Sequence, residues 1–333
     1  MKKIISLMIA CVLLACGKKE KQNPSIMIFD DSLENIINSS AEIEYLVDSL
    51  NVAEGPLWDV KSNSLLFTHI TENAIYKWNE IDGHSKYISP SGYTNYAPTI
   101  PNIGLSGANG LAFDPEGMII LAQHGDRRIA KVKNEKTISP VFETLADSYE
   151  QKRFNSPNDL VISSNGDIYF TDPTYGFMNL QDWSFDFSVK EIDFSGIYKY
   201  NASTGIELIS DELDLPNGIA LSNDEKFLYV NSSNTAEKPI IIKIDLLTSE
   251  STVFFDGSKL ASEHSGNFDG LKVHSSGNIF TTGPNGILII SDEGKLLGNV
   301  KFKGDLTNCT FDENENYLYV TGFEFVARIK LIT

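Results

Sequence analysis

Cysteine, histidine and basic residues are scarce in this sequence, and each shortage argues against a class of site. Of the three cysteines, Cys11 and Cys16 lie near the N-terminus, so Cys309 has no partner for an intrachain disulfide in the body of the chain. A single thiol in an apolar stretch is expected to be buried rather than a nucleophile. The histidines are irregularly spaced, which argues against a zinc cage. They are His69, His84, His124, His264 and His274.

Acidic residues outnumber basic ones, 45 to 27, and the formal net charge is −18. Removal of Lys2 and Lys3 with an N-terminal signal would make it −20. A chain with this charge repels nucleic acid and anionic lipid head groups. We therefore expect no nucleic-acid partner, whereas cations are drawn toward any site that can coordinate them.

The region from Ala53 to Thr333 contains no linker, no low-complexity tract and no long helical period, and turn-forming glycine and proline recur throughout. Such a pattern is typical of one all-β domain. The chain also lacks a Gly-x-Ser-x-Gly motif, and a repeated β architecture has no strand-to-helix turn for the serine of such a motif. A serine hydrolase is therefore not expected.

The first residues form a different kind of segment. Lys2 and Lys3 precede an apolar run that is well below the ~20 residues needed to span a membrane, and Leu13-Leu14-Ala15 stands immediately before Cys16. This arrangement resembles a bacterial lipoprotein signal. We predict a signal peptide at residues 1–15, a lipidated Cys16 with a tether at residues 16–27, and a folded domain at residues 28–333. The protein is then expected in the cell envelope, periplasmic or surface-facing, anchored to a bacterial membrane through Cys16. An ordinary secretory peptide or a short membrane anchor is the alternative.

Six similar phrases recur roughly 40 to 60 residues apart, which is the spacing of propeller blades. Each consists of an apolar strand, a polar turn and a second apolar strand, as in GLAFDPEGMIILAQ. In a six-bladed propeller the starts of the innermost strands meet around one end of the central channel. The sequence therefore predicts an all-β, six-bladed β-propeller with six oxygen donors facing a common point. These donors, one just before each first strand, are Glu54, Asn109, Asn158, Asn217, Asp269 and Asn308.

Carboxylate and amide oxygens, without thiols or regularly placed imidazoles, favour a hard divalent cation such as Ca²⁺. Glu54 and Asp269 together match the charge of a divalent ion, and the asparagines add neutral carbonyl oxygens. The alternative is that the Asn-Gly and Asp-Gly pairs build turns, as such pairs commonly do. Glu54 fits that alternative least, because glutamate has no special preference for turns.

Five phrases stand in order along the chain, and together they carry a family resemblance. They resemble the gluconolactonase and regucalcin superfamily, most closely its bacterial gluconolactonase-like branch, from about Ile28 to the C-terminus. The segments Asp30 to Leu46, Ser91 to Tyr93 and His124 to Arg128 also resemble that branch. The five phrases are Glu54-Gly55-Pro56-Leu57-Trp58, Ser156-Pro157-Asn158-Asp159-Leu160, Tyr169 to Gly176, Leu215-Pro216-Asn217-Gly218 and Asp269-Gly270-Leu271-Lys272-Val273.

The resemblance implies a divalent metal at the top of the propeller channel and hydrolysis of a sugar-acid lactone to the open-chain hydroxy acid. Position by position, Glu54, Asn217 and Asp269 are similar to metal ligands, and Asn158 is similar to a fourth ligand or a substrate contact. Asp269 also matches the family's general base. In the implied mechanism the metal polarises the lactone carbonyl while Asp269 accepts a proton from water.

Three further residues are candidate substrate contacts. Asn109 could hydrogen-bond sugar hydroxyls, with a structural turn as the alternative. His124 and His264 lie in turns that could reach the channel mouth, and solvent-exposed turn residues are the alternative for both. The chain departs from the family pattern at His69, where an aspartate is usual, and at Asn267-Phe268, where leucine-proline is usual. We therefore expect residues 261–268 to shape a different pocket.

The sixth repeat has only three evident strands, the last at Val326 to Leu331. A propeller ring usually closes with a strand from the other terminus, and Ile43 to Val47 is an apolar segment suited to that place. We predict that the two segments pair. Deletion up to Ser49 should then lower thermal stability sharply, whereas deletion up to Ser25 should not.

Two alternative functions are compatible with the residues. One is a propeller that binds a ligand or partner at the channel mouth without catalysis, because fold alone does not settle activity. The other is a hydrolase of different esters, including phosphotriesters. The expected partner is a small-molecule lactone, and no residue pattern specifies an oligomeric state.

Overall fold

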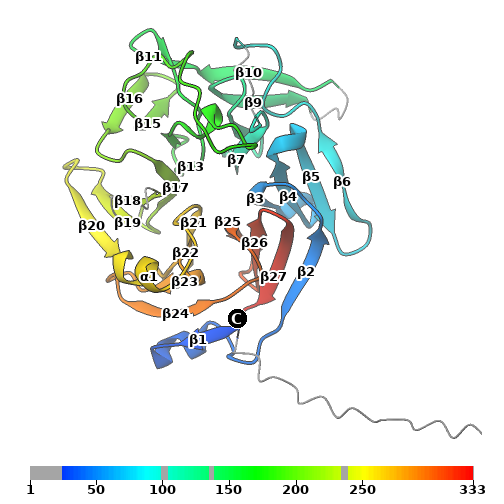
Figure 1. The fold of residues 1–333 in the computed structure, drawn as a ribbon, viewed down its shortest axis with the longest axis vertical. Coiled ribbons are helices and arrows are strands. Elements are labelled where there is room, and N and C mark those ends of the chain that lie inside the picture. The colour runs from blue at the N-terminus through cyan, green and yellow to red at the C-terminus, as the bar shows by residue number, and fades with distance from the viewer. Residues whose placement is uncertain (1–24, 99–103, 135–138, 234–238, 333) are drawn as a thin grey trace, which may run out of the picture.

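The fold comes from a computed structural model, and the residues described are 25–98, 104–134, 139–233 and 239–332. Within them, six antiparallel sheets surround a central channel like the blades of a propeller (Figure 1). The predicted six-bladed, all-β propeller is therefore confirmed. The signal peptide, Cys16 and most of the predicted tether lie outside the described residues.

Each blade begins at its innermost strand and continues outward by antiparallel pairing in sequence order. The first three blades contain β3 (Ala53–Asp59), β4 (Ser64–His69), β5 (Ala74–Asn79), β6 (Gly83–Ile88); β7 (Ala108–Phe113), β8 (Ile119–Gln123), β9 (Arg128–Asn134), β10 (Val141–Ala146); and β13 (Leu160–Ile162), β14 (Ile168–Asp172), β15 (Gly196–Asn201), β16 (Gly205–Ser210). The last three contain β17 (Pro216–Leu221), β18 (Phe227–Ser232), β19 (Ile240–Asp245), β20 (Ser251–Asp256); β21 (Leu271–Val273), β22 (Ile279–Gly283), β23 (Gly286–Ile290), β24 (Leu296–Val300); and β25 (Leu306–Phe311), β26 (Tyr317–Gly322), β27 (Phe325–Lys330).

The second strand of a blade is covered on both faces, which explains its nearly continuous apolar sequence. Strands β4 and β8 are buried along their whole length. Leu66 and Ile75 of the first blade share a hydrophobic cluster with Leu121 and Ala130 of the second. The core therefore lies between neighbouring blades, and it holds the inner strands in place around the channel.

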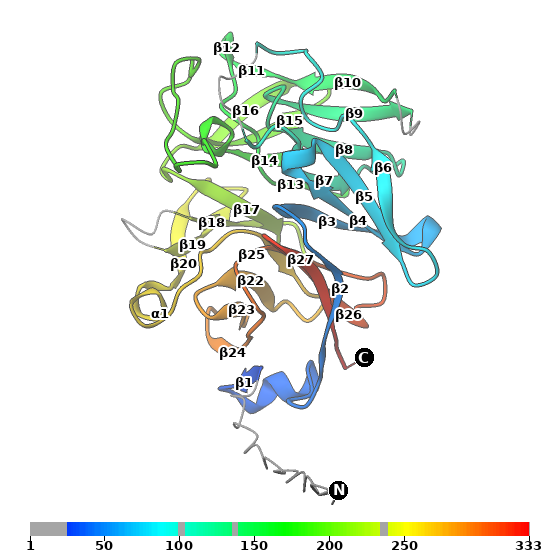
Figure 2. The ribbon, with the colours of Figure 1, turned by 45° about the vertical axis from the view of Figure 1, so that its right-hand side comes forward.

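The ring closes between segments from the two ends of the chain. Strand β2 (Ile43–Asp48) pairs antiparallel with β27, with Ile43 opposite Ile329, and the two lie side by side in Figures 1 and 2. Arg328 of β27 strengthens this seam, because its Nη2 lies 2.8 Å from the Glu44 carboxylate of β2. The predicted pairing of the N-terminal segment with the last strand is confirmed.

A second N-terminal strand was not expected. Strand β1 (Ile26–Ile28) pairs with β24 and adds a fifth strand to the fifth blade. The 3-10 helix η1 (Asp31–Asn35) follows it and buries Leu33 completely. The sheet thus includes Ile26 and Met27, two residues that were predicted to lie in the tether.

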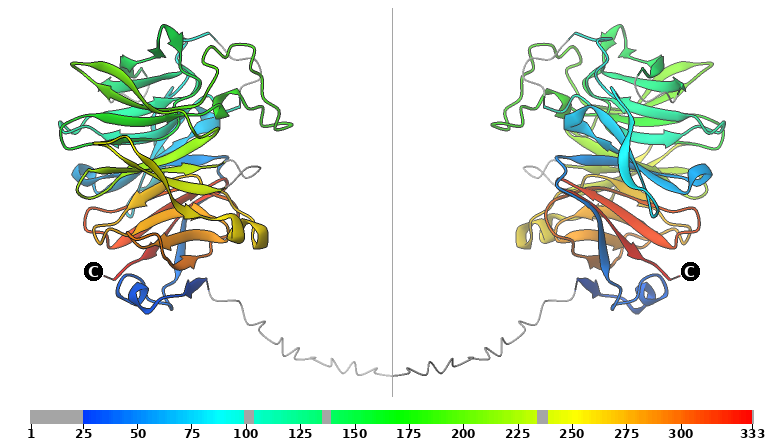
Figure 3. Two further views of the ribbon diagram at one scale, coloured as in Figure 1. Left: turned by 90° about the vertical axis from the view of Figure 1, so that its left-hand side faces the viewer. Right: turned by 90° about the vertical axis from the view of Figure 1, so that its right-hand side faces the viewer.

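Several connections extend beyond the blades. The segment between β14 and β15 projects from the same face of the ring as helix α1 (Ser258–Glu263) (Figure 3). No helix in the described part of the chain is long and apolar enough to cross a membrane. The remaining short elements are β11 (Ser148–Tyr149), β12 (Lys152–Arg153), η2 (Val60–Ser62), η3 (Ile70–Glu72) and η4 (Tyr175–Phe177).

Candidate metal and substrate site

Several candidate site residues lie on the inner strands at points where the strand register is irregular. Register shifts interrupt β3, β7 and β17 next to Glu54, Asn109 and Asn217. A bulge bends its strand and re-aims a side chain, and bulges are common beside active sites. These irregularities therefore allow side chains from different blades to turn toward one end of the channel.

A glycine after the site residue lets neighbouring inner strands come close. The backbone N–H of Gly218 donates to the carbonyl oxygen of Asp269 at 2.8 Å, and a Cβ on Gly218 would lie 2.3 Å from that oxygen. Gly55 has a φ of 48°, and a Cβ there would lie 2.0 Å from the carbonyl oxygen of Asn109. Both glycines lie inside strands, so the alternative of a turn-building Asn-Gly pair does not hold for Asn217-Gly218.

A cavity of about 630 Å³ opens at this end of the channel. The Oδ1 atoms of Asn109, Asn158 and Asn217 are buried there without a hydrogen-bond partner among the described residues. Buried oxygens without partners are costly, and here they stand beside two carboxyl groups. The predicted site residues that line the cavity are Glu54, Asn109, His124, Asn158, Asn217, His264 and Asp269.

The donor chemistry of this cavity fits a hard cation. No three His, Cys, Asp or Glu side chains in the described ranges form a group that could hold a metal by themselves. A cation here would therefore be held by amide oxygens together with Glu54 and Asp269. Ca²⁺ accepts this combination of carboxylate and amide carbonyl ligands, whereas zinc prefers sulfur and nitrogen.

The two carboxyl groups lie in an environment that disfavours their charged forms. Burial raises the pKa of Asp269 well above its usual range, and Glu54 and Asp159 raise it further. Burial, followed by the charge of Asp159, also raises the pKa of Glu54 to about 7. The Gly55 N–H, which donates to Glu54 Oε2 at 2.5 Å, acts in the opposite direction.

Asn308 differs from the other five oxygen-bearing residues. Its side-chain nitrogen donates to Glu54 Oε2 at 3.1 Å, and its Oδ1 accepts from the backbone N–H of Cys309 at 2.8 Å. It is not among the residues that line the cavity. The expectation of six converging oxygen donors is therefore corrected to five, because the amide of Asn308 turns its N–H group toward Glu54.

The candidate histidines occupy contrasting positions. His124 is 1% exposed, so the alternative of a solvent-exposed turn is wrong for it, and its Nε2 lies 3.2 Å from Asn109 Nδ2. Burial lowers the pKa of His124 to about 4. The ring is therefore neutral near pH 7 and can accept a hydrogen bond from Asn109.

His264 follows α1 and is exposed at the rim of the cavity. His69 is not a lining residue, and its Nε2 accepts from the backbone N–H of Asn51 at 3.3 Å.

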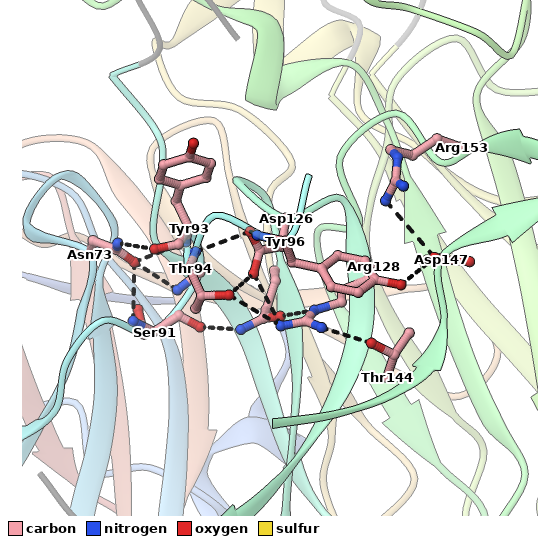
Figure 4. Close-up of polar contacts among 12 residues, drawn as sticks. Asn73, Ser91, Tyr93, Thr94, Tyr96, Asp126, Arg128, Thr144, Asp147 and Arg153 are labelled. Carbon is pink, nitrogen blue, oxygen red and sulfur yellow. Dashed lines mark hydrogen bonds and ion pairs between the residues drawn. The ribbon is translucent and has the colours of Figure 1, made fainter. Parts of the chain in front are cut away.

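A polar network fastens the segment after β6 to the second blade (Figure 4). Asn73 Oδ1 accepts from the backbone N–H of Ser91 at 3.0 Å, and Ser91 Oγ accepts from the backbone N–H of Ala108 at 3.1 Å. Arg128 and the buried Asp126 form an ion pair at 3.1 Å. Because Ala108 directly precedes Asn109, the network also holds Asn109 in place.

The sequence alone assigned no role to Tyr175, Asp159 or Lys272, although all three lie inside the phrases that carry the resemblance. Tyr175 lines the cavity, and burial followed by the charge of Asp269 raises its pKa, so the phenol keeps its proton. Asp159 is 2% exposed, and its Oδ2 lies 3.8 Å from Lys272 Nζ. The sequence held one signal for a role of Asp159, which is that it directly follows the predicted site residue Asn158.

Residues 52–324 match the SMP-30/Gluconolactonase/LRE-like region. The chain belongs to this family. It is 33% identical over 317 residues to a gluconolactonase of Zymomonas mobilis, an alignment that covers 92% of this chain and 85% of that protein.

Solved structures agree with this membership of the SMP-30/Gluconolactonase/LRE-like family. A gluconolactonase of Xanthomonas campestris superposes with a TM-score of 0.78 at 25% identity, covering 93% of this chain and 96% of that one. A calcium-binding protein of Agrobacterium tumefaciens, regucalcin, has a TM-score of 0.63 at 16% identity, with 87% and 95% of the two chains covered. The similarity to regucalcin shows the shared propeller fold alone.

Proposed function

We propose that this protein hydrolyses sugar-acid lactones at the channel cavity, using a divalent metal, most simply Ca²⁺. Its gluconolactonase homologue supports sugar-lactone hydrolysis, which is a lactonase, or carboxylic-ester hydrolase, activity. The observation that carries the metal-dependent mechanism is the set of buried, unpartnered amide oxygens in the same cavity as two carboxyl groups. Regucalcin, described as calcium-binding, has the same fold, which is in keeping with Ca²⁺.

Four residues would hold the ion: Glu54, Asn158, Asn217 and Asp269. When bound, a divalent ion polarises a lactone carbonyl and stabilises the negative charge that forms on its oxygen. Asp269, whose ionised form would be favoured beside a bound cation, accepts a proton from the attacking water as the water oxygen bonds to the carbonyl carbon. The ring C–O bond then breaks and the proton passes to the ring oxygen, which leaves an open-chain hydroxy acid. No covalent bond to the protein is required.

Asn109 is suited to orient the substrate. Its Nδ2 faces His124 at 3.2 Å, which leaves its Oδ1 free in the cavity to accept a hydrogen bond from a substrate hydroxyl. His124 acts through this contact by fixing the direction of the amide. His264, exposed at the rim, is placed to meet the polar part of an entering substrate.

The proposed base is tested by Asp269→Asn, which keeps the shape of the side chain but cannot accept the proton. We expect proton release from a panel of aldono-lactones to fall by at least about 100-fold, the range typical of losing general-base catalysis. Asp292→Asn, which removes an exposed carboxylate, is the charge-matched control. Ca²⁺ binding without turnover in the wild-type protein would instead identify a binding propeller, and turnover confined to other esters would identify a different hydrolase.

We also propose that Cys16 is lipidated and anchors the protein to a bacterial membrane within the cell envelope. The motif before Cys16 supports this proposal. Incorporation of a labelled fatty acid into the full chain, and its loss in Cys16→Ser, would support it. A soluble wild-type product cleaved at another position would contradict it.

A further inference from the structure

One wall of the cavity is a hydrophobic cluster of its own, separate from the cores between the blades. Val52, Ile70 and Leu105 are its buried members, and Met178, Leu180 and Phe323 pack against them. All six line the cavity. Three of them, Met178, Leu180 and Phe323, keep part of their surface exposed. The wall thus presents apolar surface that a ligand can cover, and burial of such surface is favourable by about 25 cal/mol per Å².

Backbone hydrogen bonds hold the apolar wall in place without a ligand. The backbone N–H of Val52 donates to the carbonyl oxygen of Phe323 at 2.8 Å, and the backbone N–H of Ile70 donates to that of Val52 at 3.2 Å. The first bond ties the sixth blade to the first, and the second joins the segment before β3 to the segment after β4. Val52 has a φ of 61°, which is rare for a β-branched residue, and such conformations gather at binding and catalytic sites.

Trp183 extends the apolar wall to the rim. It lies in the segment that projects between β14 and β15 (Figure 3), it lines the cavity, and it remains 57% exposed. Its ring centroid is 6.5 Å from that of Phe323. The lining also includes polar residues, among them His264, Asn267 and Lys301. The lining of the cavity therefore combines an apolar wall with polar groups and the oxygen donors.

A polyhydroxylated sugar lactone offers little apolar surface for such a wall. The cavity of about 630 Å³ lies within the range of about 300–1,000 Å³ typical of sites that enclose drug-sized ligands. It therefore has room for a lactone ring together with a substituent of several carbon atoms.

We infer that the substrate is a lactone that carries an apolar substituent, with its ring at the oxygen donors of the channel and its substituent along the wall formed by Val52, Ile70, Leu105, Leu180, Trp183 and Phe323. The inference rests on the proposed function for the place of the ring. It deepens that function by extending the substrate class from sugar-acid lactones to lactones whose ring carries an apolar substituent.

The test compares δ-valerolactone with δ-lactones that bear a propyl or a pentyl substituent. For residues 25–333 with Ca²⁺ we expect kcat/KM to rise by roughly fourfold for each methylene buried. In Leu180→Ala and Trp183→Ala the ratio between the pentyl-bearing and the unsubstituted lactone should fall by about 10-fold or more. Leu247→Ala, which shortens an apolar side chain that is 92% exposed and outside the cavity, should keep the wild-type ratio.

A binding measurement separates failure of this inference from failure of the proposed function. The matching δ-lactams are not readily hydrolysed, and their affinities can be measured by calorimetry. If lactams bind more tightly as the substituent grows while no lactone is cleaved, the apolar site stands and lactone hydrolysis fails. If glucono-δ-lactone is cleaved while neither rate nor affinity depends on the substituent, lactone hydrolysis stands and the inference is overturned.

Discussion

The side-chain nitrogen of Asn308 lies 3.1 Å from Glu54 Oε2, which joins the last blade to the first inside the channel. The contact leaves Glu54 in one orientation, with its Oε2 also receiving the N–H of Gly55. In the proposed function Glu54 is a metal ligand, and groups that orient such a ligand typically change metal affinity by about 10- to 100-fold when they are removed.

Replacement of Asn308 by alanine should therefore weaken Ca²⁺ binding by about 10-fold or more, because Glu54 becomes free to rotate. Isothermal calorimetry measures the change directly. Asn223→Ala is the control, since that side chain donates at the surface to the carbonyl oxygen of His274 at 3.0 Å. Equal Ca²⁺ affinities in wild type and Asn308→Ala would show that the contact does not position a ligand.

Removal of the closing strand should disrupt the ring. A chain that starts at Ser25 keeps every described strand, whereas one that starts at Leu50 lacks β1 and β2 and exposes the edge of β27. Without β2 the edge of β27 is left unpaired. The loss of the buried Leu33 and Ile37 also removes part of one core cluster. Thermal unfolding should give a much lower Tm for the shorter chain, and equal Tm values would refute the role of β2.

His124 should make stability depend on pH. The fold lowers its pKa from 6.5 to about 4, so the neutral ring is favoured in the folded chain. This stabilisation is fully present above pH 6.5 and is lost as pH falls toward 4, because the unfolded chain binds the proton first. Between pH 7 and 4, wild type should lose roughly 3 kcal/mol more free energy of unfolding than His124→Gln. Urea denaturation at several pH values measures this difference, and parallel pH profiles would contradict it.

Cys309 should be inert toward thiol reagents in the folded protein. It is 0% exposed, and burial raises the pKa of its thiol to about 12. Because the thiolate is the reactive form, a disulfide reagent should modify residues 25–333 only after denaturation. Rapid stoichiometric modification of the native protein would refute the predicted burial.

The architecture was predictable because it rests on repetition. The phrase around Asn217 resembles the one around Asn109, and both occupy the same place in their blades. The closing role of β2 could also be predicted, because the sixth repeat lacked a strand and an apolar segment near the N-terminus was available.

Contacts between distant segments were less predictable. Nothing local in the sequence shows that the amide of Asn308 turns its nitrogen toward Glu54, since that orientation depends on a hydrogen bond across the ring. The burial of His124 depends on loops from other blades. The apolar wall joins Val52, Leu180 and Phe323, which are far apart in sequence and fall in connections, where no strand period marks them.

The central claim is metal-dependent lactone hydrolysis at the channel cavity. Its most direct test is proton release from glucono-δ-lactone by residues 25–333, measured after treatment with a chelator and again after Ca²⁺ is restored. The account predicts that activity is lost with the chelator and returns with Ca²⁺. Undiminished activity after complete removal of divalent ions would contradict it.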